Sequence, residues 1–554
     1  MLGLLVFIAH YLKYRQFGLY EDDYVVSAGM SFSWPAIKTN LINCFTSFER
    51  PIGFFTIVFL PYLGAKVGGL EFLHLMGFSI VWLNTVLVYI LIRQGFSQKS
   101  AFIGAVTFAL FPADTTKGLL IHAFHLQPSL TYLLLSCILY LRNKKALSYA
   151  VIILPLLTYE SAILPFFAVP LLAYNWDRAI IKKIALHILI MAAILTAYTA
   201  IRMCVGEGRL AEAASDPART IAKAAASMIL GPVCSGLLFV IRPVTGLIEF
   251  CRTDISDYFS KGYYSLIAVL AVLSWGLLRS DNGDAPKRTL YRLSSGALKM
   301  NLSMEPAEST VKLCKLVVAG MAVIVISYGL SFVHFPPIAI RGRATSVHLA
   351  ATLGWSFFCA GSFGLFLLMG EILNKKSMAT AILSVYFLLL AIFQLKVQGD
   401  YVKSWDIQKR FYREVISLCP DISEKTIIFF DKGSLRETEY IQTFSWAVPV
   451  VLEQIFSFPP EWERPPRAFP EPVEAGIKIG KGDIKWYVPT ARWRAYWDTL
   501  ALTNTIFVQF QNNKWLRKDR MIFSGRSFPV KRIHKGDRSR QFDKGPLYKY
   551  LFEN

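Results

Sequence analysis

The first 395 residues of this chain contain eleven apolar segments, and these constrain its fold more than any other feature. A transmembrane helix needs about 20 consecutive apolar residues, so several of the segments must extend into their flanks to cross a bilayer. With 54% hydrophobic residues and only 18% charged residues, the chain is far from a typical soluble composition. We therefore predict a polytopic α-helical membrane protein with about 11 transmembrane helices, near residues 1–12, 70–92, 101–112, 119–141, 146–158, 162–174, 184–202, 263–278, 313–334, 349–370 and 378–395.

Basic residues mark alternate connectors between these segments. These connectors all fall on one side if the segments alternate in direction. They are the connectors that contain Arg93, Arg142, Arg178 and Lys375, together with the 279–315 loop. Cytoplasmic loops collect Lys and Arg, so this side is predicted to be cytoplasmic, and the opposite side extracytoplasmic. The formal charge of +21 then reflects topology and contact with anionic membrane lipids, and no nucleic-acid partner is expected. We expect an integral protein of a bacterial cytoplasmic membrane.

Three apolar stretches do not fit a simple pattern of alternating spans. The opening segment, 1–12, is too short to span alone, which suggests a truncated start or a helix continued by residues missing here. The stretch 222–248 is apolar enough to cross but would invert the next connector, so we expect it to be re-entrant or interfacial. The short piece 51–63 is interpreted in the same way.

The chain changes character after residue 396. An amphipathic helical pattern is followed by the strand-like "TIIFF", and "GDIKWYV" and "TIFVQFQ" come after Pro-rich connectors. We predict a membrane domain over 1–396 and a soluble, mixed α/β extracytoplasmic domain over 397–554. The basic stretch 514–549 suits either an anionic lipid or glycan surface or a solvated tail. The eight scattered cysteines indicate neither a metal site nor a disulfide framework.

Several polar motifs fall on the predicted extracytoplasmic side, in the order "EDD" (21–23), "ERP" (49–51), "FPADTT" (111–116), "TYESA" (158–162) and "FPPIAIRGR" (335–343). A large first loop over about 13–69, with an acidic pair just after the first helix, resembles the corresponding part of the GT-C superfamily of membrane glycosyltransferases. The resemblance covers about residues 15–400. It implies an inverting transfer of a hexose or pentose from a polyprenyl-phosphate carrier to an extracytoplasmic glycan, lipid or protein acceptor.

Such a transfer needs a base for the acceptor hydroxyl and cations for the departing phosphate. The resemblance places the catalytic acids at Asp22 and Asp23, and repulsion between adjacent carboxylates raises the pKa of one toward a useful value. Because neighbours in an extended loop point in opposite directions, one acid is expected to face the acceptor while the other structures the loop or holds a cation. The alternative is that the acids only form a solvated loop or cap a helix.

The remaining candidate residues are expected to bind substrate, each with a plainer alternative. Asp114 also suits a helix N-cap, the arginines suit interfacial anchors as well as phosphate binding, and Tyr24 lies where interfacial aromatics are common. The histidine pair His122 and His125 suits polar residues lining a cavity better than metal ligands. The predicted substrate-binding set is Arg50, Asp114, His125, Glu160, Arg341, Arg343 and Tyr24.

Other function classes stay open at this point. A lipid-linked-glycan transporter would show internal repeats, and none is visible; a polysaccharide polymerase or ligase would carry its key loop late in the chain. A non-enzymatic scaffold for envelope assembly is a third alternative. The sequence names no certain cofactor and leaves open whether a divalent cation, Mg²⁺ or Mn²⁺, assists the transfer.

Overall fold

A computed structural model of the chain describes residues 1–24, 30, 33–47, 50–205, 213–253, 255–256, 267, 271, 305–331, 335–445, 447–471, 477–480, 482–488, 496–523, 526–531 and 542–553. Within these residues, six helices are long and apolar enough to cross a membrane. They are α5 (Gly69–Arg93), η3 with α7 (His122–Leu141), α11 (Ala179–Val205), α13 (Pro217–Thr253), α17 (Ala351–Ile372) and α18 (Lys376–Leu418). The helical membrane class is confirmed, whereas the total of about 11 spans stays a prediction. The expected span at 263–278 lies outside the described residues, apart from two positions.

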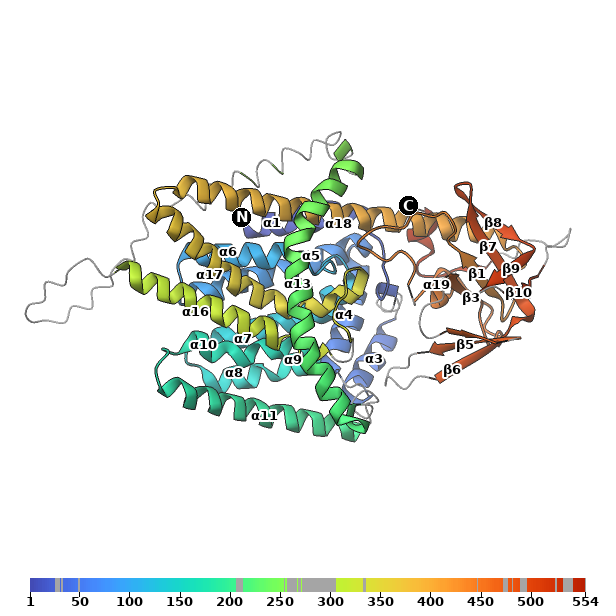
Figure 1. The fold of residues 1–554 in the computed structure, drawn as a ribbon. Helices are drawn as coiled ribbons and strands as arrows, with labels where there is room; N and C mark the ends of the chain where they lie inside the picture. Colours follow the sequence, from blue (N-terminus) through green and yellow to red (C-terminus); the bar gives the residue numbers. More distant parts are fainter. Residues whose placement is uncertain are drawn as a thin grey trace, which may run out of the picture.

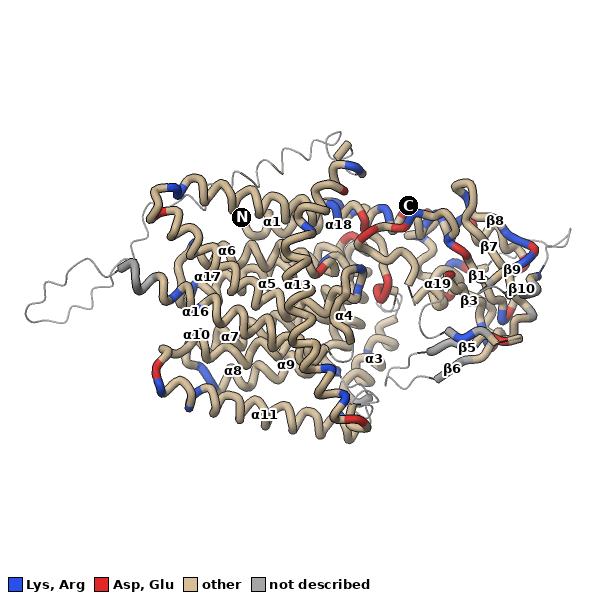
Figure 2. The backbone as a smooth tube through the Cα atoms, viewed as in Figure 1, with Lys and Arg blue, Asp and Glu red and all other residues tan. Residues whose placement is uncertain are grey.

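Further helices complete the bundle in Figure 1. They are α1 (Leu2–Val6), η1 (Phe7–Tyr11), η2 (Tyr14–Gln16), α6 (Gln98–Leu110), α8 (Lys145–Val151), α9 (Ile153–Thr158), η4 (Glu160–Ala168), α10 (Val169–Ala173) and α16 (Glu305–Ile326). Figure 2 shows Lys and Arg at both ends of the bundle, and we call the end with the turns from α10 to α11 and from α17 to α18 the basic end. The opposite end carries the C-terminal domain and is called the site end.

Helix α13 crosses the other helices instead of running beside them (Figure 1). Its glycines allow this close crossing: a Cβ on Gly231 would lie 2.3 Å from the Tyr328 ring, and one on Gly246 would lie 2.6 Å from Phe393. The opposite face of α13 exposes apolar residues, among them Ile229, Val233 and Val240. Because α13 is also long and apolar enough to cross a membrane, the re-entrant or interfacial placement expected for 222–248 stays a prediction.

Two helices, α3 (Trp34–Ser47) and α4 (Pro51–Val67), lie within the predicted first loop. The piece predicted at 51–63 is thus a helix, and Pro51 suits its first turn because proline lacks the N–H that a first turn leaves unused. Further along the chain, the domain boundary predicted at residue 396 falls inside α18. This single 43-residue helix leaves the bundle and continues into the C-terminal domain.

The C-terminal domain is mixed α/β, as predicted. Its main sheet has the order β3-β1-β7-β8, with β1 parallel to β3 and β7 and with β8 antiparallel. The strands are β1 (Ile427–Asp431), β2 (Phe456–Ser457), β3 (Arg467–Glu471), β4 (Ile477–Ile479), β5 (Asp483–Val488), β6 (Tyr496–Ala501), β7 (Thr505–Gln511), β8 (Lys514–Lys518), β9 (Arg520–Phe523), β10 (Arg526–Pro529) and β11 (Asp543–Lys544), with helices α19 (Val448–Ile455), η7 (Leu502–Asn504) and η8 (Lys549–Glu553). The three strand motifs of the sequence correspond to β1, β5 and β7.

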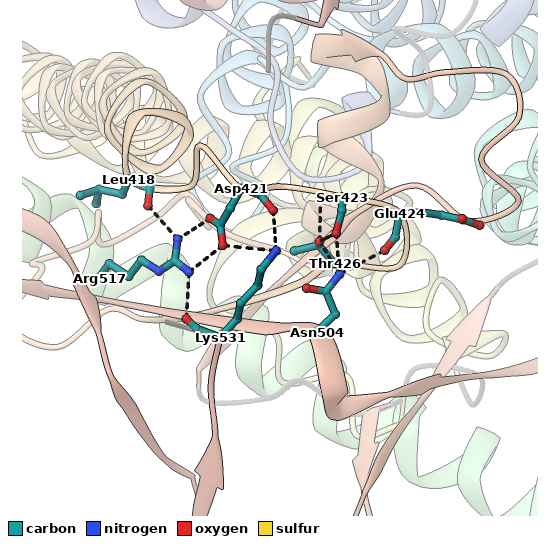
Figure 3. Close-up of polar contacts among 8 residues, drawn as sticks. All are labelled: Leu418, Asp421, Ser423, Glu424, Thr426, Asn504, Arg517 and Lys531. Atoms are coloured by element: carbon teal, nitrogen blue, oxygen red, sulfur yellow. Dashed lines mark hydrogen bonds and ion pairs between the residues drawn. The ribbon is translucent and has the colours of Figure 1, made fainter. Parts of the chain in front are cut away.

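An ion-pair network fixes the sheet to the end of α18 (Figure 3). Arg517 donates to both carboxylate oxygens of Asp421, at 2.5 and 3.0 Å, and to the Leu418 carbonyl at 3.2 Å. Lys531 Nζ donates to the Asp421 carbonyl at 2.8 Å. Two cations of the basic stretch 514–549 are therefore occupied in holding the domain to the helix.

Candidate functional site

The three adjacent acids lie in a tight turn at the site end, between η2 and α3. The Asp23 N–H donates to the Tyr20 carbonyl at 2.8 Å, and Glu21 adopts a φ of 47°. A positive φ is uncommon for residues with a side chain, and it separates the directions of the three carboxylates. Each acid consequently has different surroundings.

Glu21 points into the protein and is 1% exposed. Its Oε2 accepts from the Arg343 N–H at 2.9 Å, and its Oε1 accepts from the Gln442 N–H at 3.4 Å. Burial raises the pKa of Glu21 to about 7, against the lowering effect of these hydrogen bonds. Glu21 therefore joins the first loop to the 335–343 loop and to the C-terminal domain.

Asp23 is also inaccessible to solvent. Its Oδ1 accepts from the Ile121 N–H at 2.8 Å, and its Oδ2 accepts from the Tyr20 N–H at 3.2 Å. Burial raises the pKa of Asp23 to about 8, although backbone hydrogen bonds oppose the rise. The side chain fastens the turn to the chain just before η3. This is the loop-structuring role that the sequence assigned to one of the pair.

Asp22 is the acid that reaches the surface, with a side chain 15% exposed. Its Oδ2 accepts from Arg343 Nη1 at 2.9 Å, and the Arg343 side chain is 44% exposed. The structure thus brings together one predicted catalytic acid and one predicted phosphate-binding arginine. Both remain in contact with solvent.

Gly342 makes the approach of the two loops feasible. It has a φ of +60°, and a Cβ added there would lie 2.6 Å from Glu21 Oε1. A side chain at 342 would displace the glutamate, so the glycine is required for the contact. The short helix η6 (Gly342–His348) then carries Arg343 beside Asp22.

Arg341 lies two residues away but has a different role. Its Nη2 donates to the Thr438 carbonyl at 2.7 Å and lies 3.4 Å from Glu437 Oε2. It therefore contacts the C-terminal domain, while Arg343 contacts the acids. The Gly342 N–H adds a bond to the Tyr440 carbonyl at 2.9 Å. The loop at 335–343 is held between the bundle and this segment of the domain.

Asp114 forms a local turn and is fully buried. Its Oδ1 accepts from the Thr116 N–H at 2.9 Å and from the Thr116 hydroxyl at 2.6 Å. Thr115 continues the network to Thr345 Oγ1 at 3.1 Å. Asp114 thus shapes the loop beside η6, and this contact pattern is closer to the capping alternative than to direct substrate binding.

A second polar cluster lies between α4 and η4. Arg50 donates from Nε to Glu160 Oε2 at 2.8 Å and from Nη2 to Oε1, and Arg202 Nη1 lies 3.5 Å from the same Oε1. The Arg50 guanidinium also lies 4.7 Å from the centre of the Tyr159 ring. Both arginine side chains are about 5% exposed, and Glu160 is 22% exposed. Two guanidinium groups thus share one carboxylate.

The histidine pair lies between the two clusters. His125 Nε2 is 2.7 Å from the Thr158 carbonyl, and a Cβ on Gly53 would lie 2.4 Å from that nitrogen. His125 is therefore tightly packed beside Arg50 and Tyr159. His122, one turn earlier, lies within electrostatic range of Asp22, Asp114 and Arg343. The pair connects the clusters through one helical turn.

Tyr24 does not face an open site. It is 3% exposed, and its hydroxyl donates to Gln408 Oε1 on α18. The ring is thus placed to pack the first loop against α18, not to stack on a sugar. Among the described residues, no group of three or more His, Cys, Asp or Glu side chains could hold a metal ion.

Three residues important to the arrangement were not among the predicted site residues. Arg202 joins the Glu160 cluster, Arg242 on α13 donates to the carbonyls of Pro112 and Ile340, and Asp400 accepts from the Tyr440 N–H at 2.8 Å. Arg202 and Arg242 interrupt strongly apolar runs. Ionisable residues in such runs are costly unless they have partners, and this signal could have identified them.

Comparisons with protein-family models, curated proteins and solved structures gave no match.

Proposed function

We propose that this protein is an inverting membrane glycosyltransferase that moves a sugar from a polyprenyl-phosphate carrier to an acceptor hydroxyl at the site end. The observation that carries the proposal is the exposed pair of Asp22 and Arg343, with Oδ2 and Nη1 2.9 Å apart. A carboxylate and a guanidinium side by side supply the two groups that this transfer needs, a base and a phosphate ligand.

In the proposed step, Asp22 accepts the proton of the acceptor hydroxyl while that oxygen bonds to the anomeric carbon. The bond from the anomeric carbon to the phosphate oxygen breaks, and the carrier phosphate keeps the electron pair. Arg343 binds this phosphate through its fork of N–H donors. A phosphate on Arg343 competes with Asp22 for the guanidinium, so donor binding releases the carboxylate for proton transfer.

The cluster of Arg50, Arg202 and Glu160 supports the same proposal. Arg50 and Arg202 both contact the carboxylate of Glu160, and the planar guanidinium group of an arginine suits a phosphate. We assign to this cluster a further contact with the carrier phosphate, with Glu160 holding the arginines in place.

Two alternatives use the same residues. A polysaccharide polymerase or ligase would also need a base and a phosphate ligand, but its donor would be a lipid-linked chain. A lipid-linked-glycan transporter would bind the phosphate without any covalent change. The exposed Asp22 favours chemistry over transport, because a transporter gains nothing from a carboxylate that competes with the phosphate for its arginine.

The test uses the full-length protein in lipid nanodiscs with polyprenyl-phosphate-linked hexoses and pentoses and, as acceptor, a membrane-envelope extract. Wild type should transfer the labelled sugar, and Asp22→Asn should lose transfer while still binding polyprenyl phosphate. The matched control is Glu371→Gln, since this exposed acid lies at the basic end, 3.8 Å from Lys376. Equal transfer by wild type and Asp22→Asn would overturn the assignment of the base. Carrier movement across the bilayer without sugar transfer would instead support a transporter.

A further inference from the structure

A second set of cations lies far from the acids, at the basic end. Three lysines from three helices surround Tyr174: Lys145 of α8, Lys183 of α11 and Lys315 of α16. The ammonium nitrogens of Lys145 and Lys183 lie 5.1 and 4.6 Å from the centre of the Tyr174 ring. Lys315 Nζ donates to the Tyr174 carbonyl at 2.5 Å. We call these four residues the lysine cluster.

Two of these ammonium groups have no acidic partner. In the part of the chain that the structure describes, no carboxylate lies within ion-pair distance of Lys145 or Lys183, and both side chains are exposed. The neighbouring acid, Asp177, accepts at 3.1 Å from the Ile180 N–H at the start of α11. The cluster therefore presents positive charge to its surroundings.

Hydrogen-bonded aromatic residues pack beneath the cluster. The hydroxyls of Tyr140 and Tyr174 are 3.2 Å apart, and Tyr149 hydrogen-bonds His187 Nδ1 at 2.7 Å. His187 Nε2 is in turn 3.0 Å from the Phe166 carbonyl. The Tyr140 contact positions the Tyr174 ring beside which the two exposed ammonium groups lie.

Apolar side chains flank the cluster on the bundle surface. Leu147, Ile181 and Leu186 are 51%, 71% and 58% exposed, and they belong to the same helices as Lys145 and Lys183. Trp176, 48% exposed, lies in the same connector as Tyr174. Trp and Tyr at a helix end are typical of the membrane–water boundary. Cations at that boundary, with apolar surface beside them, match a head group with its acyl chains.

We propose that the lysine cluster binds the phosphate head group of an anionic phospholipid in the leaflet at the basic end, with its acyl chains along Leu147, Ile181 and Leu186. Basic pockets between transmembrane helices are suited to such head groups, because the lipid phosphate balances several cations at once. A free phosphate ion would meet the same cations but would gain nothing from the apolar flank. The proposal does not depend on the glycosyltransferase assignment.

The test is native mass spectrometry of the full-length protein titrated with phosphatidylglycerol or phosphatidylcholine. Wild type should retain phosphatidylglycerol in preference to phosphatidylcholine. Removing each exposed lysine should weaken this binding about 5-fold, and Lys145→Gln with Lys183→Gln about 30-fold. The matched control, Lys375→Gln with Lys376→Gln, removes the same charge from another turn of the basic end and should bind phosphatidylglycerol as wild type does.

Three outcomes would overturn the proposal. One is an equal loss in both double variants, which would mean that only net charge matters. Another is unchanged binding in the Lys145 and Lys183 variants. The third is displacement of the lipid by millimolar inorganic phosphate, which would show that the ligand is a free anion. Because both lysines are exposed, the variants are expected to fold, and circular dichroism and melting temperature check this directly.

Discussion

Arg343 Nη1 lies 2.9 Å from Asp22 Oδ2, across 321 positions of sequence. The pair exists because Gly342 lets the 335–343 loop approach the acidic turn and because Glu21 accepts from the Arg343 N–H. Of the three adjacent acids, two are thus used to build the turn and its contacts, and the third is held at the surface by a cation.

Asp22→Asn should reduce sugar transfer about 10²- to 10⁴-fold, because the amide cannot accept the acceptor proton. The protein should stay folded, since Asp22 is partly exposed and its replacement has similar size. Transfer from a polyprenyl-phosphate sugar by purified variants measures the effect. Near-normal turnover in this variant would remove the main support for the assigned base.

Asp23→Asn should act on stability instead of chemistry. Both Asp23 oxygens accept backbone N–H groups, and the amide nitrogen of asparagine would face one of these donors without accepting from it. A buried donor left unsatisfied costs about 1–3 kcal/mol. The melting temperature in detergent should therefore fall. If Asp23→Asn is as stable as wild type but inactive, Asp23 and not Asp22 is the catalytic base.

Arg343→Ala should weaken binding of polyprenyl phosphate by roughly one to two decades, since hydrogen bonds to charged groups contribute about 1.5–3 kcal/mol. Arg343→Lys should restore binding only in part, because the planar fork is lost. Arg341→Ala serves as the comparison: its guanidinium contacts Thr438 and Glu437, so carrier affinity should change little. Equal weakening in both alanine variants would show that the loop as a whole, not Arg343, sets the affinity.

Stability should fall as pH rises through neutrality. Burial raises the pKa of Glu21 from 4.5 to about 7 and that of Asp23 from 3.8 to about 8. Each group keeps its proton in the folded protein at pH values where the unfolded chain has lost it. Their contribution is complete below about pH 4 and is lost as pH rises to 7 and 8, at up to about 1.4 kcal/mol per pH unit for each group. Glu21→Gln should flatten this dependence in denaturation curves recorded between pH 5 and 9, and an unchanged slope would contradict it.

The topology expected from the basic connectors is tested with reporters. A reporter fused after Asn554 should be active only outside the cytoplasm, and one inserted near Lys145 only inside it. The structure places η8, which ends at Glu553, in the domain at the site end and Lys145 at the basic end, so the two reporters should never be active on the same side. A cytoplasmic C-terminus would put the acids on the wrong side for an extracytoplasmic acceptor.

The apolar runs and strand patterns were sufficient to predict a helical membrane domain, its basic turns and a mixed α/β domain. Local physical chemistry accounts for this success, because "TIIFF" and "TIFVQFQ" have the length and branched or aromatic content of buried strands and form β1 and β7. The boundary predicted at 396 falls inside α18, because an amphipathic pattern can continue a membrane helix without a break.

By itself, the sequence determined that Glu21, Asp22 and Asp23 and the arginines of the 335–343 loop belong to the same end of the bundle. It could not determine which acid is accessible, because three adjacent carboxylates have the same local chemistry. That choice depends on partners distant in sequence. The buried Asp23 accepts a hydrogen bond from the Ile121 N–H, and Glu21 accepts from the Arg343 and Gln442 N–H groups. The Arg343 side chain contacts Asp22. Only tertiary structure sets these distances, since burial and hydrogen bonding of a side chain are properties of the packed loops around it.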